Sequence, residues 1–456
     1  MERLLQISKS FYLDKTTQEF ALADDSMLVY GGDAGDKGIH TLRVYAKLVQ
    51  LKKVYPDRVI LLAGNRDINK MRLISELVDN REMNLNYMAK EILEGPIWVP
   101  ADKRLSLRSY LERQSKIHHS EQGLDASQWT PKDLEGVNTK VNRLKWMLNY
   151  TMGSQGDFDR RRQELAEMNE KAPHLISDEQ VLQSYLESVS PNGIIRQYLS
   201  LAQLAFICKE SLFVHGGIVN GENNNNNSFS ALEFTPQGLK TFSSIHAWAQ
   251  ALNDWNRAQI TDWVVCPFWS EDHGTRGGNH LMTYALPDYH PISVVMGRHL
   301  NASGMPVQLP YSVAKKLADN GIKRLIVGHT PHGNCPTVIP QTDDTSFQHV
   351  IMADTSYSDM KAEDNRGAAA SEIVVVDVTT HHGTIVNVHG VLENERCIRY
   401  TLVESSLVGR ALKDRSMIKA KIESESAPEY LSFSVKNRFD FHYAVKSGKD
   451  VEEELT

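Results

Sequence analysis

The chain has 456 residues, enough for about three domains of ordinary size or for one elaborated domain. Hydrophobic residues make up 41% and charged residues 23%, as in globular proteins, and no stretch reaches the ~20 consecutive apolar residues of a membrane span. The net charge of −7 argues against a protein held mainly by nucleic-acid phosphates, so neither nucleic acid nor a membrane is expected as a partner.

The cysteine pattern and the N-terminal residues indicate a compartment. Four cysteines lie far apart and no CxxC pair occurs, so the sequence predicts reduced thiols and no zinc ribbon. The segment Met1–Ser10 lacks the extended apolar core and the small-residue cleavage site of a secretory signal. We therefore expect a cytoplasmic protein.

Short apolar runs alternate with amphipathic stretches along the chain, and the apolar runs predict buried strands. The predicted strands are Met27–Tyr30, Arg58–Ala63, Ser211–His215, Arg324–Val327, His349–Ala353 and Ile373–Val378. A helical stripe containing Leu42 and Val49 links the first two strands. A second stripe, containing Val313 and Leu317, precedes the fourth strand and ends at Asn320-Gly321, a left-handed cap. Strand–helix–strand units with such short links predict an α/β layered core.

The long segment from about 72 to 200 has helical patterns and predicts a helical insertion or cap. An apolar stripe between Val137 and Leu148 is followed by a break at Gly153–Gly156, and a charged helix, Phe158–Glu170, comes next. This helix carries the triplet Arg160–Arg162. The triplet either contacts a phosphorylated substrate or belongs to a solvated face balanced by glutamates of the same helix, and the second interpretation is favoured.

These patterns divide the chain into four parts. They are a core segment 1–71, a helical insertion 72–200, a second core segment 201–403 and a polar C-terminal extension 404–456. The extension has mixed charge and ends in the acidic run Asp450–Glu454, so we expect it to be a frayed tail.

Four of the predicted strands end in polar, Gly-rich turns. The turns are Gly31-Gly32-Asp33-Ala34-Gly35-Asp36-Lys37-Gly38, Gly64-Asn65-Arg66-Asp67, His215-Gly216-Gly217 and Gly328-His329-Thr330-Pro331-His332. Ligands bind at the carboxyl ends of strands in α/β sheets, and glycines let the backbone approach a ligand closely. One carboxylate, one carboxamide and two imidazoles are therefore expected to converge on a single spot. Such oxygen and nitrogen donors suit a divalent metal such as Mn, Fe or Zn.

The succession of GDxxDKG, GN[R/H]D, VHGG and GHTP resembles the calcineurin-like metallophosphoesterases, which include the phosphoprotein phosphatases. The resemblance runs from about Met27 to Asp354, with an enlarged insertion between the second and third motifs. It implies a β-sandwich flanked by helices. It also implies two divalent metal ions that clamp a phosphate and activate a water for in-line attack. Because of the departures described below, we expect one or two such ions per chain. The expected substrate is a phosphoprotein or a small phosphate ester.

The resemblance also implies roles for individual residues. Asp33 would bridge the two metal ions. The other ligands of the second metal would be Asn65, His215 and His329. Asp36 would support catalysis by orienting the residue after Asn65. Lys37 stands where the family often has an arginine and would hold a phosphate oxygen as a point charge.

One departure from the family concerns the first metal. The family's opening D-x-H motif, which supplies most ligands of that metal, does not precede Asp33. Either the reading frame is truncated or the site is half built. His332 and Asp354, each near the end of a predicted strand, are the candidates to serve the first metal.

A second departure is Arg66, which stands where the family has a catalytic histidine. An arginine cannot donate a proton to the leaving group. It can neutralise charge on the transferring phosphoryl group and pair with Asp36, or it serves only as a structural salt-bridge partner. Arg298, which follows Ser293–Met296 between the third and fourth motifs, either supplies a further cation for the phosphate or belongs to a generic strand end.

Three functional hypotheses follow. The first is a metal-dependent phosphatase. The second is a non-catalytic relative that keeps one metal or none and binds a partner through its helical middle. The third is a hydrolase of dinucleoside polyphosphates, which would share the metal core and differ only in its pocket.

Overall fold

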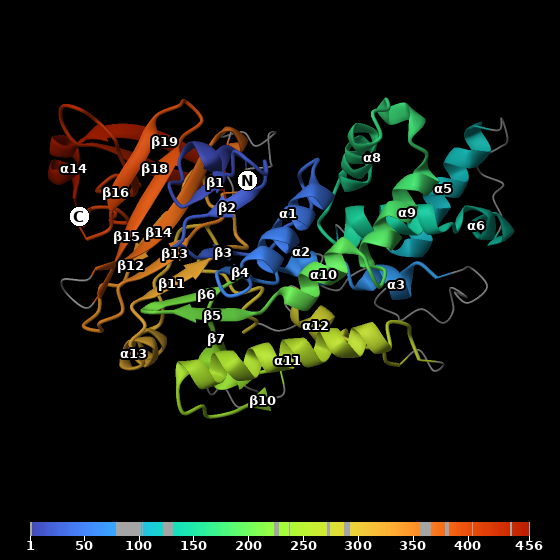
Figure 1. Ribbon diagram of the computed structural model, residues 1–456, viewed down its shortest axis with the longest axis horizontal. Coiled ribbons are helices and arrows are strands. Elements are labelled where there is room, and N and C mark those ends of the chain that lie inside the picture. The colour runs from blue at the N-terminus through green and yellow to red at the C-terminus, as the bar shows by residue number, and fades with distance from the viewer. Residues whose placement is uncertain are drawn as a thin grey trace.

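The chain is a mixed α/β protein whose sheets lie on one side and most of whose helices lie on the other (Figure 1). The computed structural model describes residues 2–78, 102, 104–121, 131–222, 228–236, 238–270, 274–286, 292–355, 366–378, 383–403, 405–437 and 440–455.

The strands and helices have the following bounds. The strands are β1 (Phe11–Leu13), β2 (Phe20–Leu22), β3 (Leu28–Tyr30), β4 (Val59–Leu61), β5 (Ala205–Cys208), β6 (Ser211–Val214), β7 (Asn220–Glu222), β8 (Ser228–Ser230), β9 (Phe234–Thr235), β10 (Gly238–Leu239), β11 (Arg324–Val327), β12 (Thr337–Pro340), β13 (His349–Met352), β14 (Ala370–Val378), β15 (Gly383–Val391), β16 (Cys397–Thr401), β17 (Met417–Ile422), β18 (Glu429–Asn437) and β19 (Asp440–Ser447). The helices are η1 (Glu2–Gln6), α1 (Thr41–Val54), α2 (Asn65–Asn69), α3 (Arg72–Glu76), α5 (Leu107–Glu121), α6 (Pro131–Val137), α7 (Lys140–Trp146), η3 (Met147–Thr151), α8 (Asp157–Met168), η4 (Pro173–Leu175), α9 (Asp178–Val189), α10 (Ile194–Leu201), η5 (Ala231–Glu233), α11 (Ile245–Val265), α12 (Asn279–Tyr284), α13 (Tyr311–Asp319), η6 (Arg366–Ala368) and α14 (Gly448–Glu454).

A five-stranded sheet of order β12-β13-β11-β6-β5 forms the centre of the fold. Strands β6, β11 and β13 run parallel, while β5 and β12 join antiparallel at the two edges. A second parallel pair, β3 and β4, lies beside it, because Leu62 bridges in parallel to Gln203 just before β5. All six predicted strands are confirmed, with ends within a few residues of those expected.

Register brings the strand ends together at one edge of the central sheet. Val214 of β6 pairs with Val327 of β11, which pairs in turn with Met352 of β13. The residues that follow these strands therefore leave the sheet side by side. Helix α1 links β3 to β4 as predicted and buries Tyr45 and Leu48 in the core, which fixes the turn after β3.

The second sheet is six-stranded and antiparallel, of order β14-β15-β16-β17-β18-β19. An apolar cluster joins it to the central sheet. The cluster includes Ile326, Val338 and Ile351 of the central sheet and Val388, Ile398 and Ile418 of the second. Two sheets thus face each other across one apolar layer.

The prediction of a frayed tail after residue 404 is wrong. This segment supplies β17, β18, β19 and α14, which complete the second sheet. In β17 the apolar Ile418, Ala420 and Ile422 belong to the cluster between the sheets. Lys419 is also buried, next to a register shift between Ile418 and Ala420, and its ammonium donates to the His332 carbonyl oxygen. Lysines placed among apolar residues give the segment the mixed composition that suggested a tail.

The described part of the middle segment is helical, as predicted. It consists of α3 and α5 to α10, with η3 and η4, and these helices form the side of the molecule away from the second sheet (Figure 1). The predicted break at Gly153–Gly156 separates η3 from α8. Gly156 has a φ of 79°, a left-handed conformation that favours glycine, so the chain can turn back toward the sheets there.

The arginine triplet of α8 pairs within the protein. Arg160 lies 2.6 Å from Asp157, and Arg162 lies 2.5 Å from Asp178. Arg161 is buried and its guanidinium stacks 4.2 Å from the centre of the Tyr185 ring. In the described structure only Arg161 faces a glutamate of the same helix, Glu164 at 3.5 Å, and Arg161 does not lie on a solvated face, because α9 covers it. The favoured interpretation therefore holds in part: the triplet is balanced by carboxylates, but mostly by aspartates.

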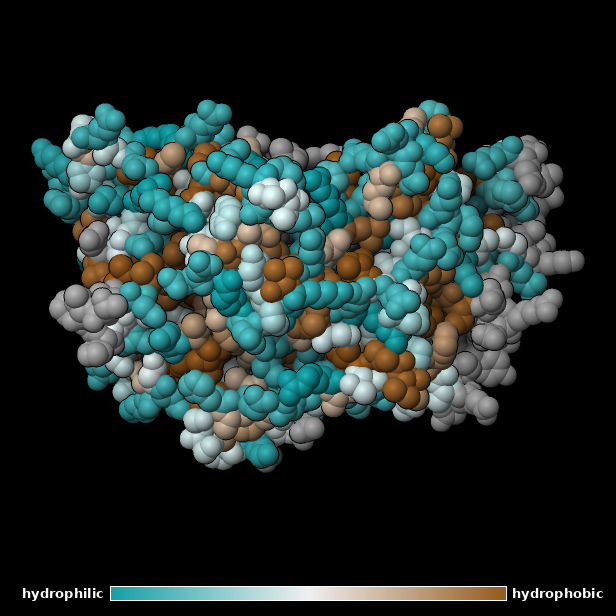
Figure 2. Space-filling view, in the orientation of Figure 1, coloured by the Kyte–Doolittle hydropathy of each residue, from teal (hydrophilic) through white to brown (hydrophobic). Residues whose placement is uncertain are grey.

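No helix in the described part of the chain has both the length and the apolar character needed to cross a membrane. Figure 2 shows one face of the molecule on which hydrophilic side chains predominate and apolar ones lie in smaller groups between them. Apolar surface spread in this way is ordinary for a folded protein.

Candidate metal centre

Three of the predicted metal ligands meet at the edge where the strands end. Asp33 follows β3, His215 follows β6 and His329 follows β11, and one ligand atom from each lies within 4.8 Å of the others. The Oδ1 of Asn65, the first residue of α2, lies 2.9 Å from Nδ1 of His329 and 3.4 Å from Nε2 of His215. The structure thus brings together one carboxylate, one carboxamide and two imidazoles.

The backbone around these residues is strained. Asp33, Asp36, Lys37 and His329 all have φ between 54° and 73°, in the left-handed region that non-glycine residues rarely adopt. Such conformations cost about 1–3 kcal/mol each and concentrate at functional sites. Two of the candidate ligands, Asp33 and His329, are among these residues, although five residues elsewhere in the described chain share the conformation.

Glycines allow the loops to approach each other. A Cβ on Gly64 would lie 2.2 Å from Oδ1 of Asp33, and one on Gly32 would lie 2.7 Å from Nδ1 of His215. Gly32 also has a φ of 91°. These two glycines are required because any side chain there would displace a candidate ligand.

His215 is oriented by a hydrogen bond to the backbone. Its Nδ1 lies 2.6 Å from the Gly31 carbonyl oxygen and donates to it, which leaves Nε2 directed at Oδ1 of Asp33, 3.3 Å away. This is how metal-binding histidines are commonly held. Burial opposes the positive charge, but Asp33 and the Gly31 carbonyl outweigh it and raise the pKa of His215 to about 9. In the metal-free chain the imidazole therefore carries a proton that a metal ion would replace.

His329 has the opposite electrostatics. Burial, followed by the charges of His215 and Arg298, holds the pKa of His329 well below its usual value. Its Nε2 is buried and has no hydrogen-bond partner in the described structure. A neutral imidazole with an unsatisfied buried nitrogen is the state that a metal ligand needs, so these residues fit a metal ion.

Asp33 itself is held ionised. Burial works against its charge, but His215 and then Arg66 outweigh the burial and keep the pKa of Asp33 far below its usual range. An ionised carboxylate is the form that binds a metal.

Asp67 ties the turn after β3 to the start of α2, a role that the sequence did not reveal. Its buried carboxylate accepts hydrogen bonds from the backbone N–H groups of Asp33 (2.8 Å), Ala34 (2.9 Å) and Gly64 (2.8 Å) and from the Tyr45 hydroxyl (2.5 Å). Burial and the neighbouring Asp33 raise the pKa of Asp67 to about 6. Its position in the first turn of α2, three residues after the N-cap, is the available sequence signal, since an acidic residue there caps a helix.

Asp36 faces away from the three ligands and into a buried ion pair. Its Oδ2 accepts hydrogen bonds from Nζ of Lys70 (2.6 Å) and from Oγ of Ser154 (2.5 Å). The predicted pairing with Arg66 is present but looser, with 3.7 Å between Nη1 and Oδ2. Lys70 and Ser154 were not expected at the site. Lys70 lies five residues after Asn65, at the C-cap of α2, and Ser154 comes from the distant break between η3 and α8.

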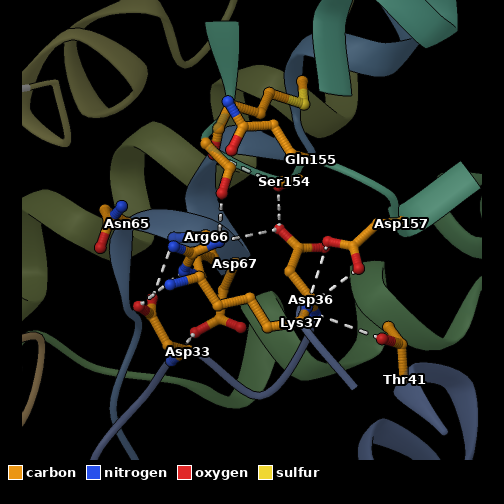
Figure 3. Close-up of polar contacts among 12 residues, drawn as sticks. Asp33, Asp36, Lys37, Thr41, Asn65, Arg66, Asp67, Ser154, Gln155 and Asp157 are labelled. Carbon is orange, nitrogen blue, oxygen red and sulfur yellow. Dashed lines mark hydrogen bonds and ion pairs between the residues drawn. The ribbon is translucent and has the colours of Figure 1, made fainter. Parts of the chain in front are cut away.

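Arg66 lies between Asp33 and Asp36 (Figure 3). Its Nε is 3.5 Å from Oδ2 of Asp33, and its Nη1 donates to the Gly153 carbonyl oxygen at 3.0 Å. Its side chain is 18% exposed, so one part of the guanidinium faces outward. Arg66 is therefore both a salt-bridge partner and a cation at the mouth of the site.

The loop between η3 and α8 forms part of the site wall. Besides Gly153 and Ser154 it brings Asp157, whose two carboxylate oxygens accept from the Lys37 backbone N–H at 3.0 and 3.1 Å. Burial and the charge of Asp36 raise the pKa of Asp157. The helical middle segment thus contributes residues to the site.

Three further candidates, Lys37, Arg298 and Asp354, are not members of the three-residue cluster. The backbone of Lys37 is fixed by Asp157, and the charge of Arg298 acts on His329. Asp354 lies outside the three-residue cluster, although its charge is among those that raise the pKa of Arg66 against the effect of burial.

The prediction that His332 serves a metal is wrong. Its Nδ1 lies 2.8 Å from Oγ1 of Thr337 and its Nε2 lies 3.0 Å from the Gly304 carbonyl oxygen. Its ring is fully buried and packs edge-on against Phe433 and Phe441 of the second sheet. His332 stands three residues after His329, one residue further than in the H-x-H spacing of the family. At that position its side chain turns toward the apolar layer between the sheets.

Comparison of the sequence with models of known protein families, and with curated proteins, gives no match.

Proposed function

We propose that this protein is a metal-dependent phosphoesterase, a phosphatase of the calcineurin-like type. The observation that carries the proposal is the meeting of Asp33, His215 and His329 within 4.8 Å, beside the guanidinium of Arg66 on the same carboxylate. A metal site next to an arginine suits a phosphate group, because the metal ion and the guanidinium are both cations that bind phosphate oxygens. The two facing sheets support a β-sandwich core of the kind that this family has.

The residues divide the chemistry as follows. Asp33, Asn65, His215 and His329 would hold the divalent ion, with Mn, Fe and Zn as the candidates that suit this donor set. When bound, the ion supplies Lewis-acid polarisation of a phosphoryl oxygen. Arg66 binds a second phosphoryl oxygen and stabilises the charge that develops on it. Lys37 and Arg298 add positive charge around the phosphate.

The place of Arg66 restricts the substrate. A guanidinium cannot give a proton to the departing oxygen, because its pKa exceeds about 12. Substrates with good leaving groups need less proton donation, so aryl phosphates and phosphoanhydrides are favoured over alkyl phosphates. The four unpaired cysteines agree with our proposal of a cytoplasmic location.

The proposal is tested by an assay of the Mn-loaded protein on an aryl phosphate, a phosphopeptide and a dinucleoside polyphosphate. We expect the aryl phosphate to be hydrolysed, and Asp33→Asn and His329→Ala to abolish turnover without lowering the melting temperature by more than a few degrees. His174→Ala, at an exposed position on η4, is the matched control and keeps full activity. Mutants at Asp33 or His329 that are as active as the wild type would disprove the site.

A non-catalytic binding protein is the second candidate, and the contacts of Arg66 favour it. This residue is already engaged by Asp33 and by the Gly153 carbonyl, and His332 points away from the ligands. Such a protein would bind inorganic phosphate in the presence of Mn and hydrolyse none of the three substrates. A dinucleoside polyphosphate hydrolase would instead act only on the third substrate.

A further inference from the structure

We infer that the site takes a single metal ion, and that the guanidinium of Arg66 takes the place of the second ion that the resemblance implies. The inference rests on the proposed metal site. It adds two statements to that proposal: how many metal ions the site holds, and which residue binds the phosphate together with the single ion.

The two carboxylate oxygens of Asp33 face different partners. Its Oδ1 faces Nε2 of His215 at 3.3 Å and accepts from the backbone N–H of Arg66 at 2.9 Å. Its Oδ2 faces Nε of Arg66 at 3.5 Å. A metal held with His215 and His329 uses the Oδ1 side. An ion on the Oδ2 side would have to lie against a guanidinium, which stays charged at all accessible pH values. Repulsion at such a distance in a buried site opposes that second ion.

Arg66 is fixed in this place. Its backbone belongs to α2, and its Nη1 donates to the Gly153 carbonyl oxygen at 3.0 Å. Nη1 also faces Oδ2 of Asp36, which accepts a hydrogen bond from Ser154 (Figure 3). Lys70 donates to the same oxygen. The arginine therefore cannot leave Asp33 without breaking contacts to two separate segments of the chain.

Neither of the two residues that the sequence offers to that ion joins the ligands in the described structure. His332 packs between the sheets, and Asp354 lies outside the three-residue cluster. The nearby Asp36 is paired with Lys70, whose side chain is completely buried. Two built-in cations, Arg66 and Lys70, thus neutralise the carboxylates that the resemblance assigns to the neighbourhood of the metals.

A consequence concerns phosphate binding. The Arg66 side chain is 18% exposed and the contact of its Nη1 with Gly153 is open to solvent, so the guanidinium can present N–H donors to an anion while it keeps Asp33. A phosphate held by one metal ion and by the planar donors of Arg66 would be bound from two sides. Arg66 is then a substrate-binding residue and not only a structural one.

The test measures metal content and the electron paramagnetic resonance spectrum of protein loaded with Mn²⁺ and freed of excess ion. We expect about one Mn per chain and the hyperfine pattern of an isolated Mn²⁺, with no signal from an exchange-coupled pair. His215→Ala should bind less than a tenth of this amount. About two Mn per chain, or the spectrum of a coupled pair, would overturn the inference while leaving the proposed function intact. No bound Mn at all would instead defeat the proposed metal site.

The role of Arg66 is tested by calorimetric binding of inorganic phosphate to the Mn-loaded protein. Loss of a charge-assisted hydrogen-bond donor predicts that Arg66→Ala binds phosphate roughly tenfold to a hundredfold more weakly. Arg66→Lys keeps the charge and should recover part of this loss. Metal content near one per chain in both variants shows that the site is folded. Phosphate binding by Arg66→Ala as tight as that of the wild type would contradict the assignment.

Discussion

The two imidazoles of the candidate site are held in opposite protonation states by their neighbours. His215 lies against an ionised carboxylate and a carbonyl oxygen, and its pKa is raised to about 9. His329 is buried and lies near the positive charges of His215 and Arg298, so burial first and then these charges hold its pKa well below its usual value. Before a metal binds, the site therefore stores one proton, on His215, beside Asp33. That proton compensates a buried negative charge.

At the residue scale this predicts a pH dependence of stability in the metal-free protein. The pKa of His215 rises from about 6.5 in the unfolded chain to about 9 in the fold, so its stabilising contribution is complete below pH 6.5 and is lost as the pH rises through about 9. We expect the free energy of unfolding, measured by urea denaturation with a chelator present, to fall by at most about 3 kcal/mol over this range. His215→Gln should lack this fall, and the exposed His246→Gln should keep it. Equal slopes in all three proteins would contradict the assignment.

The elements that build the site are short and meet end to end. Helix α2 begins at Asn65, with Gly64 as its N-cap, shortly after β4 ends at Leu61. Asp67 in its first turn ties this start to the turn that follows β3. The loop before α8 closes the arrangement through Gly153 and Ser154. The geometry of the ligands therefore depends on how closely these backbones approach each other.

Two glycine substitutions test the close approach at the element scale. In Gly64→Ala the new methyl group would lie 2.2 Å from Oδ1 of Asp33 and 2.4 Å from its backbone nitrogen, so α2 must move. We expect Mn²⁺ affinity, measured by calorimetry, to fall at least tenfold. Gly31→Ala is the matched control, because its methyl group would meet nothing within 4 Å. Unchanged Mn²⁺ affinity in Gly64→Ala would show that the start of α2 does not determine the site.

At the scale of the whole molecule, the C-terminal segment is part of the core. Strands β17 to β19 complete the second sheet, and Phe433 of β18 packs against His332, which comes from the loop after β11. The ammonium of Lys419 lies over the same ring, 4.9 Å from its centre, and donates to the His332 carbonyl oxygen at 2.7 Å. The second sheet therefore supports the loop that carries His329.

Truncation of Phe433 measures this support. Phe433→Ala removes a buried ring and should lower the free energy of unfolding by about 3–5 kcal/mol, as seen in a chemical denaturation curve. Phe268→Ala, whose ring is 57% exposed, should change it by less than about 1 kcal/mol. Equal stability of the two variants would mean that the C-terminal strands do not carry the fold.

The sequence predicted the parts of the molecule whose signals are local. Buried parallel strands are continuous apolar runs, and the turns after them are rich in glycine and polar residues, so Asp33, Asn65, His215 and His329 could be named in advance. Of the second sheet only β14 was predicted, and β15 to β19 were missed because these strands mix polar and charged residues with apolar ones. Ser154 was missed because its contact with Asp36 spans 118 residues, and no spacing rule reaches across a helical segment of that length. The orientation of His332 depends on the second sheet and was missed with it.

The central claim is that Asp33, His215 and His329 hold a metal ion that this protein needs to hydrolyse phosphate esters. The most direct measurement is the steady-state hydrolysis of an aryl phosphate by protein treated with a chelator and then titrated with Mn²⁺. The structure predicts that chelation abolishes turnover and that Mn²⁺ restores it in the wild type but not in His329→Ala. Full turnover in the chelated protein, or equal recovery in His329→Ala, would contradict the claim.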